Sequence, residues 1–224
     1  MLKTWVIEDS LKGQTIIPCS KILKEKRGPS GEIKTYCVQI VAGGHKQIES
    51  VNYTETFSAA AKLPLVHVVL ANAAMLDWEI HQVDIKSAYH NAPLKEMVYM
   101  KIPRGAAKPG QEGKVCQLLK GIYGLKQAGR GWHKELTRVF THDLGFTQSS
   151  IDHLVFYRTH GDEHTIVAVA TNDIVITPKC HADIIRFKSN LSGHWYLNDL
   201  GEINWYLGFE VKHNRPAHTI SINQ

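Results

Sequence analysis

Two segments that lie far apart in the sequence each place a carboxylate beside an apolar, strand-like run. The first, QVDIKSAY (residues 82–89), contains Asp84, and the second, AVATNDIVI (residues 168–176), contains Asp173. Carboxylates on neighbouring strands can hold the two divalent cations of nucleotidyl transfer, because hard cations prefer oxygen ligands. The second segment has Asn172 where this chemistry calls for a further aspartate. The pattern predicts a two-metal site with one carboxylate missing.

Alternating and β-rich runs predict the strands that must position these carboxylates. Residues 78–84 alternate as a strand does, and the runs 154–159 and 165–170 form a predicted hairpin around a turn that tolerates glycine. Asn172 and Asp173 then fall at the next turn, between paired strands. Further strands are expected at residues 21–26, 32–42 and 98–102, with a last hairpin over 205–222.

Helical spacing predicts three helices between these strands. The first opens at Pro64, and its inward face is predicted to carry Leu65, Val68, Val69, Ala73 and Leu76. The second has an apolar stripe and ends at Gly145; the stripe consists of Trp132, Leu136, Val139, Phe140 and Leu144. The third covers residues 181–191. Strands and helices alternate without a regular βαβ series, so the expected fold class is α+β.

Composition narrows the class of protein. The 224 residues are 43% hydrophobic and 21% charged, as in a folded globular chain. A net charge of +5 suits a polyanionic partner. The four cysteines form no CxxC pair, disulfide framework or zinc motif, which favours a reduced, intracellular protein. No apolar stretch is long enough for a membrane span, and none resembles a signal peptide.

Several strings together resemble the reverse transcriptase domain of copia-type LTR retrotransposons. They are YTETFS at 53–58, QVDIKSAY at 82–89, YM at 99–100 with Pro103 and Gly105, YGLKQ at 123–127 with Arg130 and Trp132, DLG at 199–201 and YLGFEV at 206–211. The resemblance covers residues 17–224, and the wording of 168–176 is most similar to fungal members.

The resemblance implies a right-hand polymerase fold of fingers and palm, with an antiparallel palm sheet backed by helices and the thumb absent. The whole chain, 1–224, would be a single reverse transcriptase-like domain. The fingers would comprise mainly residues 1–75 and 104–128, the palm mainly 76–103 and 129–204, and a primer-grip hairpin 205–224.

The resemblance also implies an RNA-directed DNA polymerase that uses two Mg²⁺ ions, with Mn²⁺ as a substitute. Asp84, Asp173 and the backbone carbonyl of Ile85 would be the metal ligands, and Asn172 would occupy a degenerate catalytic position. An asparagine offers a carbonyl oxygen but no charge. Losing one charged ligand is expected to slow the reaction roughly a thousandfold.

Further contacts follow from the same resemblance. Tyr89 would lie beneath the incoming sugar and reject a 2′-hydroxyl, Gln127 would contact the sugar-phosphate of the incoming nucleotide, and Lys126 and Arg130 would contact phosphate or template. Gln39 stands where family members commonly carry an arginine, and glutamine cannot reproduce the bidentate grip of arginine on phosphate.

The primer grip would be formed by Leu207, Gly208 and Phe209. Without the resemblance, the candidate site residues also have ordinary structural explanations. Asp84 could be a surface aspartate at a strand end, Tyr89 a core residue, and Lys126 part of a solvated helix start.

Three functional alternatives remain open from the sequence. The chain is an active polymerase domain within a longer polyprotein, an inactive relic, or a co-opted fragment that binds nucleic acid without catalysis. Its expected partners are an RNA or DNA template-primer and dNTPs, with no membrane. The thumb and RNase H region would come from a longer polyprotein. The expected location is the cytoplasm, a virus-like particle or the nucleus.

Overall fold

The chain folds as two compact units. The computed structural model describes residues 3–27, 31–56 and 62–224. The first unit comprises Met1–Ser58 and Tyr89–Trp132, and the second comprises Ala59–Ala88 and His133–Gln224. The predicted fingers and palm boundaries stay a prediction; the compact units place 62–75 in the second unit and 89–103 in the first. The helix opened by Pro64 therefore lies in the same unit as Asp84 and Asp173.

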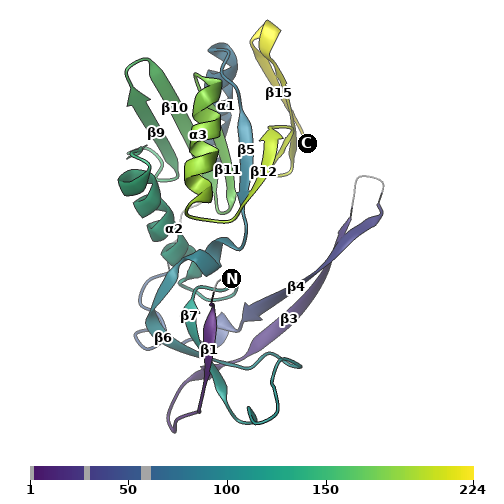
Figure 1. Ribbon diagram of the computed structural model, residues 1–224, viewed down its shortest axis with the longest axis vertical. Helices are drawn as coiled ribbons and strands as arrows, with labels where there is room; N and C mark the ends of the chain where they lie inside the picture. Colours follow the sequence, from purple (N-terminus) through teal and green to yellow (C-terminus); the bar gives the residue numbers. More distant parts are fainter. Residues whose placement is uncertain (1–2, 28–30, 57–61) are drawn as a thin grey trace. The chain divides into compact units, whose positions relative to one another are not determined.

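The first unit contains a four-stranded sheet and a two-stranded ribbon (Figure 1). The sheet has the order β1-β7-β6-β2, comprising β1 (Trp5–Glu8), β7 (Val115–Lys120), β6 (Pro93–Lys101) and β2 (Ile16–Ile17). The ribbon pairs β3 (Cys19–Arg27) with β4 (Ile33–Ala42), and the short turns are η1 (Gly44–Lys46) and η2 (Ala88–Asn91). The ribbon confirms the strands predicted at 21–26 and 32–42; part of the predicted turn between them lies outside the described residues.

The end of β4 packs against the loop that carries the YGLKQ string. The backbone N–H of Ala42 donates to the carbonyl of Tyr123 at 2.8 Å. Gly124 has a φ of +89°, and a Cβ there would overlap the carbonyl oxygen of Ala42 and lie 2.7 Å from the Val41 side chain. Glycine at this position therefore permits an approach of two backbones that no other residue allows.

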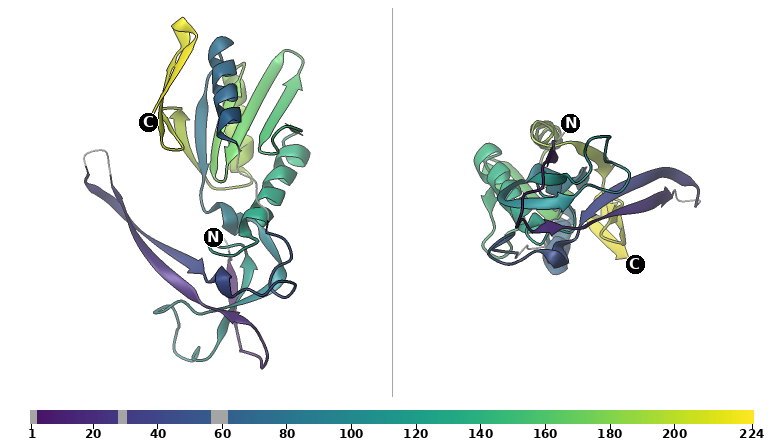
Figure 2. Two further views of the ribbon diagram at one scale, coloured as in Figure 1. Left: turned by 180° about the vertical axis from the view of Figure 1, so that it is seen from behind. Right: turned by 90° about the horizontal axis from the view of Figure 1, so that it is seen from below.

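The second unit is built on an antiparallel six-stranded sheet with helices on both faces. The order is β12-β5-β11-β10-β9-β8, comprising β12 (Leu197–Glu202), β5 (His81–Ile85), β11 (Asp173–Pro178), β10 (Glu163–Ala170), β9 (Val155–His160) and β8 (Thr147–Gln148). Helix α3 (His181–Ser192) covers one face in Figure 1, and α1 (Leu63–Met75) covers the other in Figure 2. The α+β class and the β9–β10 hairpin are confirmed.

Two apolar layers hold these helices to the sheet. On the α1 side, Val69 and Ala73 pack with Val175 of β11. Ile174 and Ile176 flank Val175 and are fully buried, and because side chains alternate along a strand they face the α3 side. There Phe140 contacts Phe187 of α3, with ring centroids 5.9 Å apart.

The predicted second stripe is confirmed and the predicted face of the first helix is wrong. All five residues of the second stripe are buried, on α2 (Ala128–Arg138), on the π-turn η3 (Val139–Asp143) and just after it. In α1, however, Val68 is 59% exposed and Leu76 is 51% exposed. The buried residues are Val66, Val69, Leu70, Ala73 and Ala74. Helix α1 is apolar on nearly every side, so the spacing does not define one face and contacts with the sheet decide it.

A three-stranded sheet completes the second unit. It comprises β13 (Trp205–Tyr206), β14 (Phe209–Asn214) and β15 (Thr219–Asn223), with the turn η4 (Arg215–Ala217) between the last two. The β14–β15 pair confirms the hairpin predicted at the end of the chain, and β15 packs against α1. None of the helices in the described ranges is long and apolar enough to cross a membrane.

Candidate active site in the second unit

The two acidic segments meet on adjacent strands of the second unit. Asp84 on β5 lies directly opposite Asp173 on β11 in the antiparallel register. The backbone N–H of Ile85 donates to the carbonyl of Asn172 at 2.8 Å, which places the Ile85 peptide beside the turn. Asp84 and Asp173 are both half-buried. The structure therefore brings together the residues that the sequence predicts as a metal site.

Asn172 completes this arrangement through its side chain. Its amide Nδ2 donates a hydrogen bond to Oδ1 of Asp84 in close contact. The preceding residue, Thr171, has a φ of 59°, so the turn enters β11 through a left-handed residue. Asn172 thus does more than remove a charge, because its amide also occupies a carboxylate oxygen that a cation would use.

The carboxylate of Asp173 lies in an unfavourable electrostatic environment. Burial and the neighbouring Asp84 raise the pKa of Asp173, and a hydrogen bond from Gln82 offsets part of that rise. Burial, with a contribution from Asp173, also raises the pKa of Tyr206, whose buried hydroxyl has no hydrogen-bond partner among the described residues. The donor set fits a cation, since a positive charge would relieve the repulsion between the two aspartates.

Sequence reasoning missed several residues around this site. Gln82 shares a face of β5 with Asp84, and the two-residue alternation of a strand could have identified it. Tyr206 comes from β13; it begins the quoted YLGFEV string, but nothing in that string places its side chain near Asp173. Next to Asp84, the ammonium of Lys86 lies 4.5 Å from the ring centroid of Tyr196, and the backbone N–H of Lys86 donates to the carbonyl of Tyr196.

The raised pKa of Asp173 predicts a pH-dependent stability. The folded chain binds this proton more tightly than the unfolded chain, so stability falls as the pH rises from about 4 through the raised pKa. We expect Asp173→Asn to raise Tm at pH 7 in the presence of EDTA, by the equivalent of up to about 1 kcal/mol, because like charges that face each other across strands repel. The difference shrinks toward pH 4.5. Thermal unfolding followed by circular dichroism measures both values.

Asp162→Asn is the matched control for this experiment, because Asp162 is exposed in the turn between β9 and β10. It removes the same charge and leaves Tm at pH 7 nearly unchanged. A lower Tm for Asp173→Asn than for wild type at pH 7 would contradict the prediction.

The predicted nucleotide contact Gln127 is buried in the first unit, with 5% of its surface exposed. Its Nε2 donates to the carbonyl of Asn52 at 2.7 Å, and its Oε1 accepts from Nε2 of Gln47 at 2.9 Å. Oε1 of Gln47 in turn accepts from the backbone N–H of Lys126. Both ends of the Gln127 amide are thus occupied internally, so contact with a nucleotide would require it to exchange these partners.

The cations predicted to contact phosphate also have partners within the first unit. Nζ of Lys126 donates to the hydroxyl of Tyr53 at 3.1 Å and lies 4.4 Å from the centroid of that ring. Arg130 forms an ion pair with Glu55. Phosphate binding by either cation would compete with these contacts.

The other two predicted nucleotide contacts in the first unit are Tyr89 and Gln39. The ring of Tyr89 packs edge-on against Tyr123 at 4.7 Å between centroids. Gln39 is half-buried on β4, opposite Ile22 of β3. Their contacts with a nucleotide remain predictions.

The predicted primer grip forms a tight hairpin turn in the second unit. Tyr206 pairs with Phe209, so Leu207 and Gly208 are the two turn residues. Both have positive φ, 49° and 90°, which is the twist that two-residue hairpins favour. Leu207 is 42% exposed, and Phe209 packs edge-on against His67 of α1. The turn therefore presents a leucine in a conformation that favours glycine.

Comparison with known proteins identifies the class to which this fold and site belong. Residues 2–224 match the family described as reverse transcriptase (RNA-dependent DNA polymerase). The chain therefore belongs to the reverse transcriptase family, and the predicted copia-type assignment is confirmed.

Its relatives are Pol polyproteins of transposons. It is 33% identical to that of transposon RE1 from Arabidopsis thaliana, over 88% of this chain and 13% of the relative. It is 28% identical to that of TNT 1-94 from Nicotiana tabacum, over 99% of this chain and 17% of the relative. The putative transposon Ty5-1 protein of Saccharomyces cerevisiae is 26% identical, over 58% of this chain and 42% of the relative. The relatives thus include plant and yeast transposons, and the likeness of residues 168–176 to fungal members stays a prediction.

The chain thus spans less than a fifth of the two plant polyproteins. Among solved structures, a foamy viral protease-reverse transcriptase in complex with double-stranded DNA aligns with a TM-score of 0.48 and 10% identity, over 93% of this chain and 31% of the other.

Proposed function

We propose that this copia-type reverse transcriptase domain retains the palm chemistry of RNA-directed DNA synthesis in a severely weakened form. Asp84 and Asp173 bind the divalent cations, and Asn172 weakens that binding. The placement of Asp84 opposite Asp173, with the Asn172 amide bonded to Asp84, is the observation that supports this proposal.

The residues of the site have distinct roles in this proposal. Asp84 and Asp173 supply negative oxygen ligands, and Gln82 orients Asp173 through its hydrogen bond. Divalent cations, when bound, stabilise negative charge on the attacking and leaving oxygens of nucleotide addition. Asn172 opposes their binding, because its amide donor must leave Asp84 before that oxygen can accept a cation.

Primer extension on an RNA template tests this function. The wild-type chain is assayed with Mg²⁺ and with Mn²⁺ beside Asp84→Asn, under single-turnover conditions. We expect slow extension by wild type, faster with Mn²⁺, and a further loss of at least about a hundredfold in Asp84→Asn. Equal residual rates in the two proteins would show that the extension does not come from this site, and the proposal would be wrong.

A non-catalytic nucleic-acid-binding role is the second candidate, supported by the net charge of +5. Binding driven by phosphate contacts weakens steeply with added salt. A fluorescence-anisotropy titration of a labelled RNA–DNA duplex at several salt concentrations therefore separates the candidates. Salt-sensitive binding without any extension favours the binding role, and the absence of both favours an inactive relic.

A further inference from the structure

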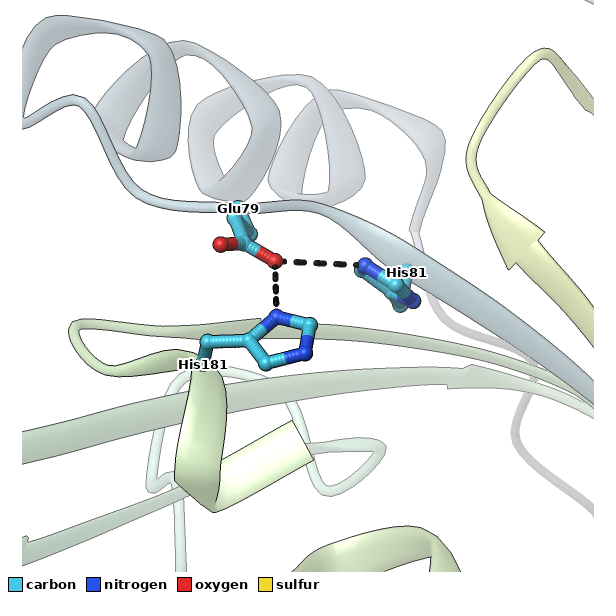
Figure 3. A group of neighbouring side chains, drawn as sticks. All are labelled: Glu79, His81 and His181. Atoms are coloured by element: carbon cyan, nitrogen blue, oxygen red, sulfur yellow. Dashed lines mark hydrogen bonds and ion pairs between the residues drawn. The ribbon is translucent and has the colours of Figure 1, made fainter. Parts of the chain in front are cut away.

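A second group of metal-ligating side chains lies on the other face of the sheet from Asp84. Glu79 precedes β5, His81 is the first residue of β5, and His181 is the first residue of α3 (Figure 3). One ligand atom from each lies within 4.8 Å of the other two. His81 and Asp84 are an odd number of positions apart on β5, so their side chains point to opposite faces. This group is therefore separate from the candidate active site.

One nitrogen of each imidazole lies close to the same carboxylate oxygen. Oε2 of Glu79 lies 2.7 Å from Nδ1 of His181 and 3.4 Å from Nε2 of His81 (Figure 3). In a tetrahedral zinc site, metal–ligand distances near 2.0–2.1 Å separate the ligand atoms by about 3.3 Å. The observed spacing needs only a small opening to admit an ion.

His81 is the residue whose setting points to a ligand. It is 9% exposed, and its Nε2, which faces Glu79, is buried without a hydrogen-bond partner among the described residues. Its contact with Oε2 of Glu79 at 3.4 Å is not a hydrogen bond, and a buried polar atom that makes none costs about 1–3 kcal/mol. A metal ion bound between His81 and Glu79 would satisfy it.

Neighbouring charged groups orient the carboxylate. Arg215 lies 3.5 Å from Oε1 of Glu79 and also pairs with Asp77, so the other oxygen, Oε2, is directed toward the two imidazoles. Such outer contacts commonly fix the ligands of a metal site.

We propose that Glu79, His81 and His181 bind a transition-metal dication of the Zn²⁺ class, with the open position taken by water. Two imidazoles and one carboxylate suit this class of ion, whereas Mg²⁺ prefers oxygen ligands alone. No local sequence pattern marks the site, because the ligands come from the start of a strand, the loop that leads into it and a distant helix.

Lys188 influences metal binding through the position of the proton on His81. Its ammonium donates to Nδ1 of His81 at 3.0 Å and to Asp199 at 2.6 Å. With Nδ1 accepting, the proton of a neutral His81 is on Nε2, the atom that must be bare to bind a metal. Metal binding therefore requires Lys188 to turn to Asp199 alone while the His81 proton moves to Nδ1. Removing the Lys188 ammonium is expected to favour the metal.

Calorimetric titration with Zn²⁺, in excess Mg²⁺ to fill oxygen-rich sites, tests the proposal. We expect one tight Zn²⁺ site in wild type. The Zn²⁺ affinity is expected to fall by at least about 10–100-fold in Glu79→Gln and in His181→Ala, since loss of an outer contact of a ligand already has that effect. His181 has a side chain 59% exposed, so its loss leaves the fold intact. His153→Ala, at another exposed histidine of the second unit, serves as control and binds as wild type does.

Two further measurements complete the test. Zn²⁺ is expected to raise Tm in wild type and His153→Ala but not in His181→Ala, because binding to the folded state alone stabilises it. Lys188→Met is expected to bind Zn²⁺ more tightly than wild type. Equal Zn²⁺ affinity in wild type, Glu79→Gln and His181→Ala would overturn the proposal, and unchanged or weaker binding by Lys188→Met would overturn the role of Lys188.

Discussion

We expect Asn172→Asp to extend a DNA primer on an RNA template about a thousandfold faster than wild type in Mg²⁺. The substitution acts in two ways at the same oxygen atoms. It removes the amide that donates to Oδ1 of Asp84, and it adds a negative ligand to a site that has Asp84 and Asp173. Both changes are expected to strengthen cation binding at the site where negative charge develops on the attacking and leaving oxygens. Single-turnover extension with excess template-primer measures the rate.

Asn172→Ala separates these two effects. Alanine frees Oδ1 of Asp84 from the amide but adds no charge, so we expect it to gain far less than Asn172→Asp. Equal rates for the aspartate and alanine variants would show that the missing carboxylate is not what limits the site. A gain in Mn²⁺ smaller than the gain in Mg²⁺ is also expected, because wild type already performs better with Mn²⁺ under the proposed mechanism.

The second large effect is expected from Gly124→Ala, which we predict to destabilise the first unit by about 4 kcal/mol or more. The added methyl group would overlap the carbonyl oxygen of Ala42, and the residue would have to keep a φ of +89°. Ala42 cannot move away easily, because the overlapping oxygen belongs to its backbone and its N–H donates to the carbonyl of Tyr123. Urea unfolding, with hydrogen exchange of the amides in β4 and β7, locates the loss in the first unit.

Gly113→Ala provides the matched control. Gly113 also lies in the first unit with a φ of +78°, but a Cβ there would meet no atom within 4 Å. We expect it to lose only the conformational preference of glycine, about 1 kcal/mol. If both variants lost the same stability, the close approach of Gly124 to Ala42 would not be the cause.

The elements around the candidate site could be predicted because their signals are local. Strand alternation, the glycine-tolerant turn of the β9–β10 hairpin and the apolar stripe that includes Leu136 and Phe140 each need only a short window of sequence. The register that sets Asp84 opposite Asp173 comes from the structure, because antiparallel pairing alone does not decide which residues face each other.

Features that depend on distant partners could not be predicted. The inward face of α1 is the clearest case, since Val66 and Leu70 are buried where the spacing favoured Val68 and Leu76. A helix that is apolar nearly all round leaves that choice to the sheet it meets.

The hydrogen-bond partners of the polar side chains could not be predicted either. The amide of Gln127 is held by Gln47 and the Asn52 carbonyl, and no local pattern relates these residues. The same holds for His181, whose partner Glu79 lies 102 positions earlier in the chain.

The hydrogen bond between Asn172 and Asp84 bears on how far the stability of the fold depends on metal. With asparagine in place, Oδ1 of Asp84 has a hydrogen-bond donor within the turn, and two carboxylates face each other there. A restored aspartate would instead set three carboxylates together, and they would repel one another whenever metal is scarce. An aspartate at position 172 would therefore make the stability of the fold depend on bound metal, whereas the asparagine avoids this electrostatic penalty.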